Sequence, residues 1–171
     1  MIIKESFDYI IVGGGSAGAV IANRLTADPA IRVALVEAGE TDRRFPSNLK
    51  TLLPFGNVFL LSDSRYNWQY AYDAAPEVGG REINCPRGRM LGGCTVLNGA
   101  VYIRGHAHDY DDWAQYGIKG WNFTDVLPAF KAHENWHGPD SQFHGTGGEL
   151  DVDSLRSPNP LARAFVAAGV Q

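Results

Sequence analysis

The chain has 171 residues, 44% of them hydrophobic and 20% charged, and it carries a formal net charge of −4. That length and composition favour a folded domain with a buried core and argue against intrinsic disorder. Interspersed charges provide no basic field for nucleic acid, and neither a signal peptide nor a membrane-spanning run is recognisable, so we expect a cytoplasmic protein that binds neither nucleic acid nor membrane.

The amino-terminal part alternates between strand and helix patterns. Residues 7–12 are apolar and β-branched and end at glycines, which predicts a strand buried on both faces of a parallel sheet. Apolar residues then recur at helical spacing over 17–25, and residues 32–37 predict a second strand. Strand, helix and strand within about thirty residues make a βαβ unit, so we expect an α/β, Rossmann-like fold with a parallel sheet.

The middle of the chain is less regular. Residues 41–86 are rich in Pro, Asn, Ser and aromatics, and only 68–72 alternate, as an edge strand or a cover over a pocket would. For the aromatic residues of that run, plain sheet packing is the simpler interpretation and lining a substrate mouth is the alternative. A glycine-rich stretch follows over residues 87–101.

Helical patterns dominate the last third. The predicted elements are helices over 108–115 and 124–136, a strand over 149–153 and a helix opened by Asn159-Pro160. Thr124, with Pro128 soon after it, is the expected start of the second helix. Gln171 lies two residues after Gly169, a residue type that normally closes a helix and leads on, so we expect the natural chain to continue.

The most specific pattern lies between the first strand and the first helix. Gly13, Gly15 and Gly18 have the G-x-G-x-x-G spacing. In a dinucleotide-binding fold the first glycine permits a tight turn, the second lets the backbone approach a pyrophosphate, and the third lets helix and strand pack closely. Glu37 ends the second strand, where a carboxylate can accept hydrogen bonds from ribose hydroxyls, which favours FAD or NAD over NADP. A tight turn without a ligand is the plainer alternative.

The same residues also spell G-x-S-x-G around Ser16, which is the nucleophile-elbow pattern of hydrolases. An elbow serine follows several strands of a sheet, whereas only thirteen residues precede Gly14. We therefore interpret Ser16 as a helix-start residue beside a phosphate.

Histidine spacings suggest metal sites that the sequence does not complete. His106 and His108 form an H-x-H pair, and His133 and His137 lie four apart on a predicted helix, but no third ligand converges on either pair. We therefore expect no metal. The two cysteines of the chain are too few for a disulfide framework.

Residues 88–102 are unusually rich in glycine for so apolar a stretch. Backbone free of bulky side chains can offer N–H groups to a phosphate or to the polar edge of a flat ring, and the Asn98 amide can both donate and accept. A loop shaped by packing alone is the alternative.

Together these patterns resemble the glucose-methanol-choline (GMC) oxidoreductases. The matching segments, in family order, are Gly13–Gly18, Val36–Gly39, Gly88–Cys94 with Asn98, Arg104-Gly105, Asp109–Asp111 with Trp113, Gly120-Trp121, and His144-Gly145 with Gly147-Gly148. They cover essentially the whole chain, and several motifs in order are far more specific than any one. The resemblance implies an FAD-binding domain over 1–150, with 41–86 as a cover segment and 87–101 as a flavin-binding loop, and the truncated start of an α+β substrate domain over 151–171.

The resemblance also implies a set of cofactor-binding residues. Gly13, Gly15, Ser16 and Gly18 would hold the FAD pyrophosphate, Glu37 the adenosine ribose, and Met90, Cys94, Asn98, Gly99, Ala100 and Val101 would lie along the flavin and its pyrophosphate. Ala17, Ala38, Arg89 and Gly93 complete the predicted set. Leu97 stands where some members carry the histidine that attaches FAD covalently, which implies non-covalent FAD.

In this family an alcohol is oxidised by removal of its hydroxyl proton and hydride transfer to flavin N5, and the base is a histidine near the carboxyl terminus with a histidine or asparagine partner. No residue of this sequence matches either, so the catalytic residues are unknown and expected beyond residue 171. We predict that the chain supplies the FAD-binding part of an alcohol oxidase or dehydrogenase, with a small-molecule alcohol as substrate and the rest of the enzyme as a second chain. The alternatives are a hydroxynitrile lyase of the same fold, a non-catalytic FAD-binding fragment that needs a partner chain, and an NAD dehydrogenase.

Overall fold

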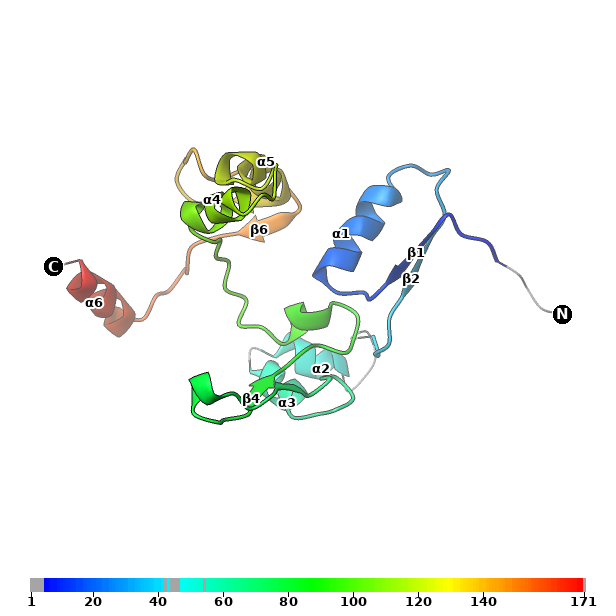
Figure 1. Cartoon of the computed structure of the whole chain (residues 1–171), viewed down its shortest axis with the longest axis horizontal. Coiled ribbons are helices and arrows are strands. Elements are labelled where there is room, and N and C mark those ends of the chain that lie inside the picture. Colours follow the sequence, from blue (N-terminus) through cyan, green and yellow to red (C-terminus); the bar gives the residue numbers. More distant parts are fainter. Residues whose placement is uncertain (1–4, 42, 44–46, 54, 171) are drawn as a thin grey trace. The chain divides into compact units, whose positions relative to one another are not determined.

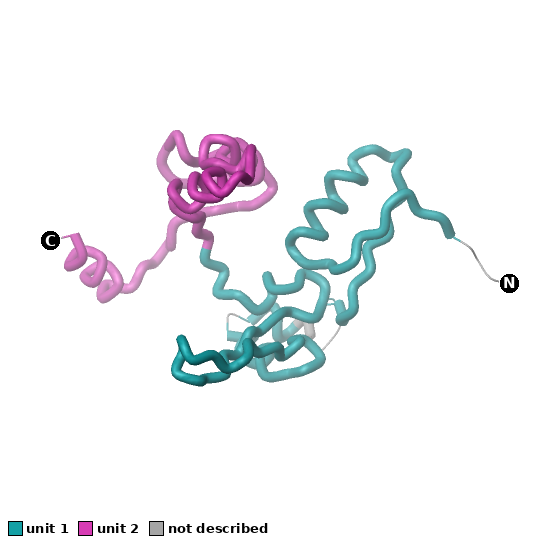
Figure 2. The backbone as a smooth tube through the Cα atoms, viewed as in Figure 1, with its two compact units in different colours: residues 1–101 teal, residues 102–171 magenta. Residues whose placement is uncertain are grey.

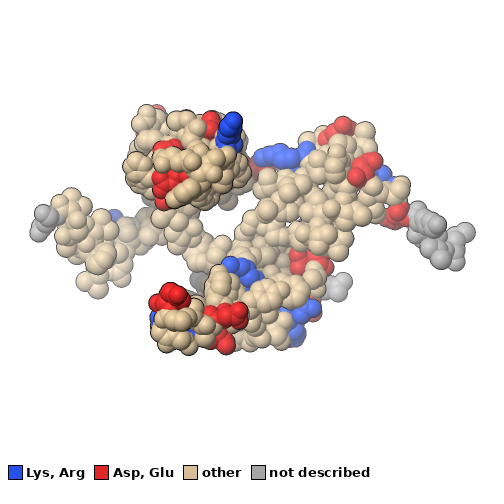
Figure 3. Space-filling model, viewed as in Figure 1, with Lys and Arg blue, Asp and Glu red and all other residues tan. Residues whose placement is uncertain are grey.

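The computed structural model describes residues 5–41, 43, 47–53 and 55–170. The chain forms two compact units, residues 1–101 and residues 102–171 (Figure 2). No helix within the described ranges is long and apolar enough to cross a membrane. On the face drawn in Figure 3, acidic and basic residues are scattered among uncharged ones.

The first unit opens with the predicted βαβ arrangement (Figure 1). β1 (Tyr9–Val12) pairs in parallel with β2 (Val33–Val36), in a register that runs from Tyr9 opposite Val33 to Val12 opposite Val36. α1 (Ser16–Leu25) connects the strands and packs against both. The parallel pair and its helix confirm the α/β, Rossmann-like prediction.

The prediction that the first strand is buried on both faces is wrong for this chain. Ile10 is 67% exposed and Val12 is 85% exposed. β1 pairs with β2 and packs against α1, and much of its remaining apolar surface is open to solvent. An apolar run indicates that a strand favours burial on both faces. It does not indicate whether the neighbouring strands and helices that would bury it are present in the chain.

The remainder of this unit is more ordered than the sequence predicts. α2 (Ser47–Leu52) packs against α3 (Gly56–Leu61), and β3 (Tyr70–Tyr72) pairs antiparallel with β4 (Ile83–Cys85). Two short 3-10 helices, η1 (Pro76–Val78) and η2 (Gly93–Val96), complete it. α2 and α3 have six residues each, too few to show a helical period in the sequence, and helices this short depend on packing for their stability.

A small core joins α3 to the glycine-rich segment. Leu60, Tyr66 and Met90 are almost completely buried, and Leu97 is 8% exposed. Each such side chain contributes roughly 1.5–3 kcal/mol when it is fully buried. This core fixes the glycine-rich segment because Met90 and Leu97 belong to it.

The second unit contains α4 (Ala107–Gln115), α5 (Phe123–His133) and α6 (Pro160–Gly169), with β5 (Glu134–Trp136) parallel to β6 (Leu150–Val152). α5 differs from the helix predicted over 124–136. Asn122 caps it by accepting a hydrogen bond from Asp125 N at 3.0 Å, and Pro128 lies inside the helix. The last three residues of the predicted helix form β5 instead, because the backbone becomes extended at Glu134 and pairs with β6.

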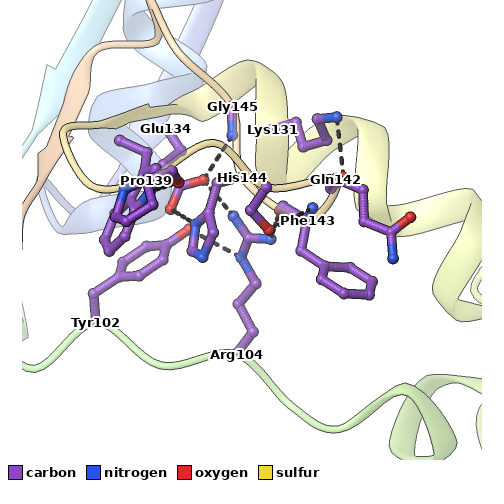
Figure 4. Close-up of polar contacts among 11 residues, drawn as sticks. Tyr102, Arg104, Lys131, Glu134, Pro139, Gln142, Phe143, His144 and Gly145 are labelled. Atoms are coloured by element: carbon purple, nitrogen blue, oxygen red, sulfur yellow. Dashed lines mark hydrogen bonds and ion pairs between the residues drawn. The ribbon is translucent and has the colours of Figure 1, made fainter.

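A buried carboxylate links the segments of this unit (Figure 4). Glu134 is fully buried, Arg104 Nη2 donates to its Oε2 at 2.7 Å, and His144 Nδ1 lies 2.8 Å from its Oε1. Gly145 N also donates to Oε2, at 2.9 Å. Burial alone would raise the pKa of Glu134, but the hydrogen bonds from Gly145 and His144 and the charge of Arg104 outweigh it, so this pKa lies below its ordinary value.

Candidate cofactor-binding site

An open cleft of about 600 Å³ lies in the first unit, where β1 and β2 end and α1 begins. Nine of the predicted cofactor-binding residues line it: Gly13, Gly15, Ser16, Ala17, Gly18, Glu37, Ala38, Gly93 and Cys94. In α/β sheets, ligands bind in the crevice at the carboxyl ends of the strands. The cleft therefore lies at the position where α/β folds of this kind bind ligands.

The turn between β1 and α1 has the shape that its glycines predict. Gly13 adopts a φ of 99°, and its N–H donates to the carbonyl of Val36 at 2.7 Å, which ties the turn to β2. A Cβ at Gly18 would overlap the carbonyl oxygen of Gly13. Glycine is therefore needed at position 18 for α1 to approach the turn this closely.

α1 begins at the cleft with its first N–H groups free of intrahelical partners. Gly15 is the N-cap residue, and Ala19 N is the first to bond back along the chain, to Gly15 O at 2.9 Å. Within the described residues no side chain caps this end, and the first turn carries no acidic residue. The N–H groups of Ser16, Ala17 and Gly18 and the positive end of the helix dipole therefore make this end of the cleft favourable for phosphate.

Glu37 supports the turn as well as lining the cleft. Its Oε2 accepts a hydrogen bond from Gly14 N at 2.7 Å, and its Oε1 accepts one from Gly39 N at 2.9 Å. The sequence indicated only a contact with ribose hydroxyls. Each carboxylate oxygen has a second lone pair, so Glu37 can accept hydrogen bonds from hydroxyls while it holds the backbone.

The second glycine segment packs on the first. Gly92 N donates to Gly14 O at 2.8 Å. Gly93 has a φ of 56°, and a Cβ there would lie 2.8 Å from the Cα of Gly15. The sequence left open whether this segment contacts a ligand or only packs; the structure shows close packing, and Gly93 also lines the cleft.

Six predicted cofactor-binding residues do not line the cleft: Arg89, Met90, Asn98, Gly99, Ala100 and Val101. The Met90 side chain is buried in the core. Asn98 Oδ1 accepts a hydrogen bond from Ala100 N at 2.9 Å and so stabilises a local turn. Contacts of these six residues with a cofactor stay a prediction.

Six residues of the cleft wall were not among the predicted cofactor-binding residues, although two of them lie in the predicted flavin-binding loop: Val12, Val36, Trp68, Tyr70, Arg87 and Gly88. Val12 and Val36 are the last residues of their strands, and that position could have identified them. Sheet packing was the simpler interpretation of the 68–72 run, yet Trp68 and Tyr70 lie on the cleft wall. The alternating pattern does not account for their placement, because Gln69 between them has a φ of 53° and is not extended.

The two histidine pairs lie in different local structures. His106 is the N-cap of α4, its Nδ1 accepts a hydrogen bond from His108 N at 3.3 Å, and Asp109 accepts one from His106 N at 2.7 Å. His133 ends α5 and His137 follows β5, so the prediction that they share a helix is wrong. In the described part of the chain no group of three or more potential ligand side chains could hold a metal, and both cysteines are free.

A glycine turn, an open helix end and a strand-terminal carboxylate around one cleft define an α/β dinucleotide-binding protein. The model of the GMC oxidoreductase family matches residues 7–171, and the chain belongs to that family. GMC oxidoreductases are FAD-dependent, so the family assignment favours FAD over NAD.

Known proteins agree with this assignment. An oxygen-dependent choline dehydrogenase from Vibrio vulnificus (strain YJ016) is 41% identical over 169 residues, which cover 98% of this chain and 30% of the relative. The crystal structure of pyridoxine 4-oxidase from Mesorbium loti is 38% identical with a TM-score of 0.84, covering 96% of this chain and 32% of that one. An FAD-dependent oxidoreductase from Chaetomium thermophilum is 27% identical with a TM-score of 0.79, over 95% of this chain and 29% of that one. The chain thus spans about 30% of the length of the curated relative.

Proposed function

We propose that this chain forms the FAD-binding part of a flavoprotein that oxidises the CH–OH group of a small-molecule alcohol. The observation that carries the proposal is the cleft, which combines the glycine turn, the open end of α1 and the Glu37 carboxylate. Choline and pyridoxine, in the names of two of its relatives, both carry an alcohol group.

The residues of the cleft suit FAD. The first N–H groups of α1 would bind the pyrophosphate, and Glu37 would accept hydrogen bonds from the adenosine ribose. A Cβ built at Gly13 would meet nothing within 4 Å, so there is space for a ligand beside the turn. Arg87 on the wall adds a positive charge that would offset the charge of the phosphates.

When bound, FAD supplies the hydride acceptor for oxidation of the alcohol carbon. The residues of this chain hold the cofactor and position it. We infer that Arg89, Met90 and 98–101 contact the flavin and its pyrophosphate. Leu97, which precedes Asn98, has no nucleophilic atom, and this supports non-covalent FAD.

The base that removes the hydroxyl proton is proposed to come from a second polypeptide that carries the remaining family length. The support for this is that the chain covers 30% of the choline dehydrogenase relative. A complex of the two should bleach flavin absorbance when an alcohol such as choline is added, and the chain alone should not.

Titration of the purified chain with FAD, followed by flavin fluorescence, tests cofactor binding. We expect saturable binding. Acid precipitation of the protein should leave the flavin in the supernatant, because the proposed FAD is bound non-covalently. Gly18→Ala should weaken binding at least about tenfold because its Cβ forces α1 away from the turn. Gly169→Ala is the matched control, since a Cβ there meets nothing within 4 Å. A wild-type chain that fails to bind FAD contradicts the proposal.

A further inference from the structure

Trp68 and Tyr70 place a stacked pair of aromatic rings on the cofactor cleft, and this pair is called the aromatic wall. Their rings are parallel to within 2°, with centroids 5.9 Å apart, which is the geometry of an offset stack. Trp68 is 41% exposed and Tyr70 is 53% exposed, so part of each ring remains open to solvent. We propose that this wall binds a flat heteroaromatic ring of the dinucleotide by stacking, and this inference rests on the proposed function.

The indole of Trp68 also contacts a basic side chain. The guanidinium carbon of Arg89 lies 4.7 Å from the centroid of the Trp68 ring, a cation–π contact. Arg89 Nε is buried and has no hydrogen-bond partner among the described residues. A ring that is already immobilised loses less side-chain entropy when a ligand stacks on it.

A strained bend orients the two rings. Gln69, between Trp68 and Tyr70, has a φ of 53°, a conformation that side chains other than glycine rarely adopt. The buried Asn67 stabilises the bend, because its Oδ1 accepts hydrogen bonds from Gln69 N at 3.0 Å and Arg87 N at 2.9 Å. Asn67 Nδ2 in turn donates to Leu61 O at 2.7 Å. Such strain persists where the surroundings over-determine it, and it clusters at ligand sites.

The position of the wall indicates what it binds. It faces the same cleft as the open end of α1 and Glu37. An isolated phosphate would need only the helix end, whereas a dinucleotide carries phosphates, ribose hydroxyls and flat rings in one molecule. The ring is either the adenine or the isoalloxazine of FAD, since both present the same π-face.

Binding of FAD and of ADP to four proteins tests the wall and distinguishes the two rings. The proteins are the wild-type chain, Trp68→Leu, Trp68→Phe and Tyr72→Ala. Leucine keeps an apolar side chain without a π-face, and phenylalanine keeps the π-face. Tyr72 is the matched control because it is an exposed aromatic residue of β3 that does not line the cleft. Circular dichroism and the thermal midpoint of each variant report whether it is folded.

We expect Trp68→Leu to bind FAD about 5- to 100-fold more weakly, and Trp68→Phe and Tyr72→Ala to stay close to wild type. An equal loss for ADP identifies adenine as the stacked ring, and a loss for FAD alone identifies the isoalloxazine. If a folded Trp68→Leu binds FAD as wild type does, or if Trp68→Phe loses as much as Trp68→Leu, the stacking inference is overturned while the proposed function stands. If the wild-type chain binds neither compound, both fail together.

Discussion

At the residue scale, Gly93 and Gly15 are the position where the two glycine segments of the cofactor cleft pack against each other. Gly93→Ala would place a Cβ in a left-handed conformation and 2.8 Å from backbone. Gly80→Ala isolates the conformational cost, because Gly80 has a φ of 68° but open space around it. We expect Gly80→Ala to cost about 1 kcal/mol of unfolding free energy and Gly93→Ala roughly 1–3 kcal/mol more, measured by urea denaturation. Equal losses would show that the two glycine segments do not pack as described.

Glu37 carries a second residue-scale prediction. Glu37→Gln replaces one accepting oxygen with a donor, so it can no longer accept from both Gly14 N and Gly39 N. We expect FAD to bind about tenfold more weakly, because the N–H of Gly14 or of Gly39 loses its hydrogen-bond acceptor and the turn is less well held. Isothermal titration calorimetry measures the change, with the exposed Glu40→Gln as control. Unchanged affinity in Glu37→Gln would remove Glu37 from the site.

At the scale of elements, α5 depends on its first residues. Asn122 accepts hydrogen bonds from Asp125 N and from Thr124 Oγ1, at 3.0 and 2.6 Å. Asn122→Ala should lower the unfolding free energy of the second unit by about 1 kcal/mol, whereas Asn122→Asp should retain most of it. Chemical denaturation followed by far-UV circular dichroism measures both. An alanine variant as stable as wild type would show that Asn122 is not the effective cap.

The buried carboxylate at the start of β5 predicts a pH dependence. The pKa of Glu134 is lowered on folding, so its contribution to stability is present above its unfolded value of about 4.5 and is lost as pH falls through the folded value. The urea midpoint of the second unit should therefore fall on acidification below about pH 4.5, and it should fall less in Glu134→Gln.

Trp136 stacks on His144 with ring centroids 4.2 Å apart, and its fluorescence can report this transition. An acid transition that is identical in wild type and Glu134→Gln would show that other groups control it.

Glu134→Ala should lower the free energy of unfolding by about 3–5 kcal/mol at neutral pH, because it leaves the Arg104 charge without its partner.

At the scale of the whole molecule, many large apolar side chains of the described residues are exposed, and contiguous exposed apolar surface often marks an interaction site. Large apolar side chains are exposed on β1, on β2 and along α6, where Leu161 and Phe165 are 78% and 82% exposed. The proposed second polypeptide would cover such surface. Native mass spectrometry of co-expressed material should therefore show the 18.6 kDa chain with FAD and a larger polypeptide. A chain that stays monomeric, soluble and free of flavin under the same conditions would contradict both the partner and the cofactor.

The sequence by itself determined the βαβ unit and the glycine turn of the cleft, because strand period, helix period and the spacing of Gly13, Gly15 and Gly18 are local properties of the chain. It also indicated the family through the order of its motifs. Only the tertiary structure decided that Trp68 and Tyr70 join the cleft wall, that Glu37 holds the turn, and that residues 134–136 form a strand. These features depend on residues far apart in sequence, since Asn67 holds the bend beside Trp68 by bonding to Arg87, and β5 becomes a strand by pairing with β6. A local pattern cannot encode which distant backbone groups will satisfy those hydrogen bonds, and so this part of the site had to be read from the folded chain.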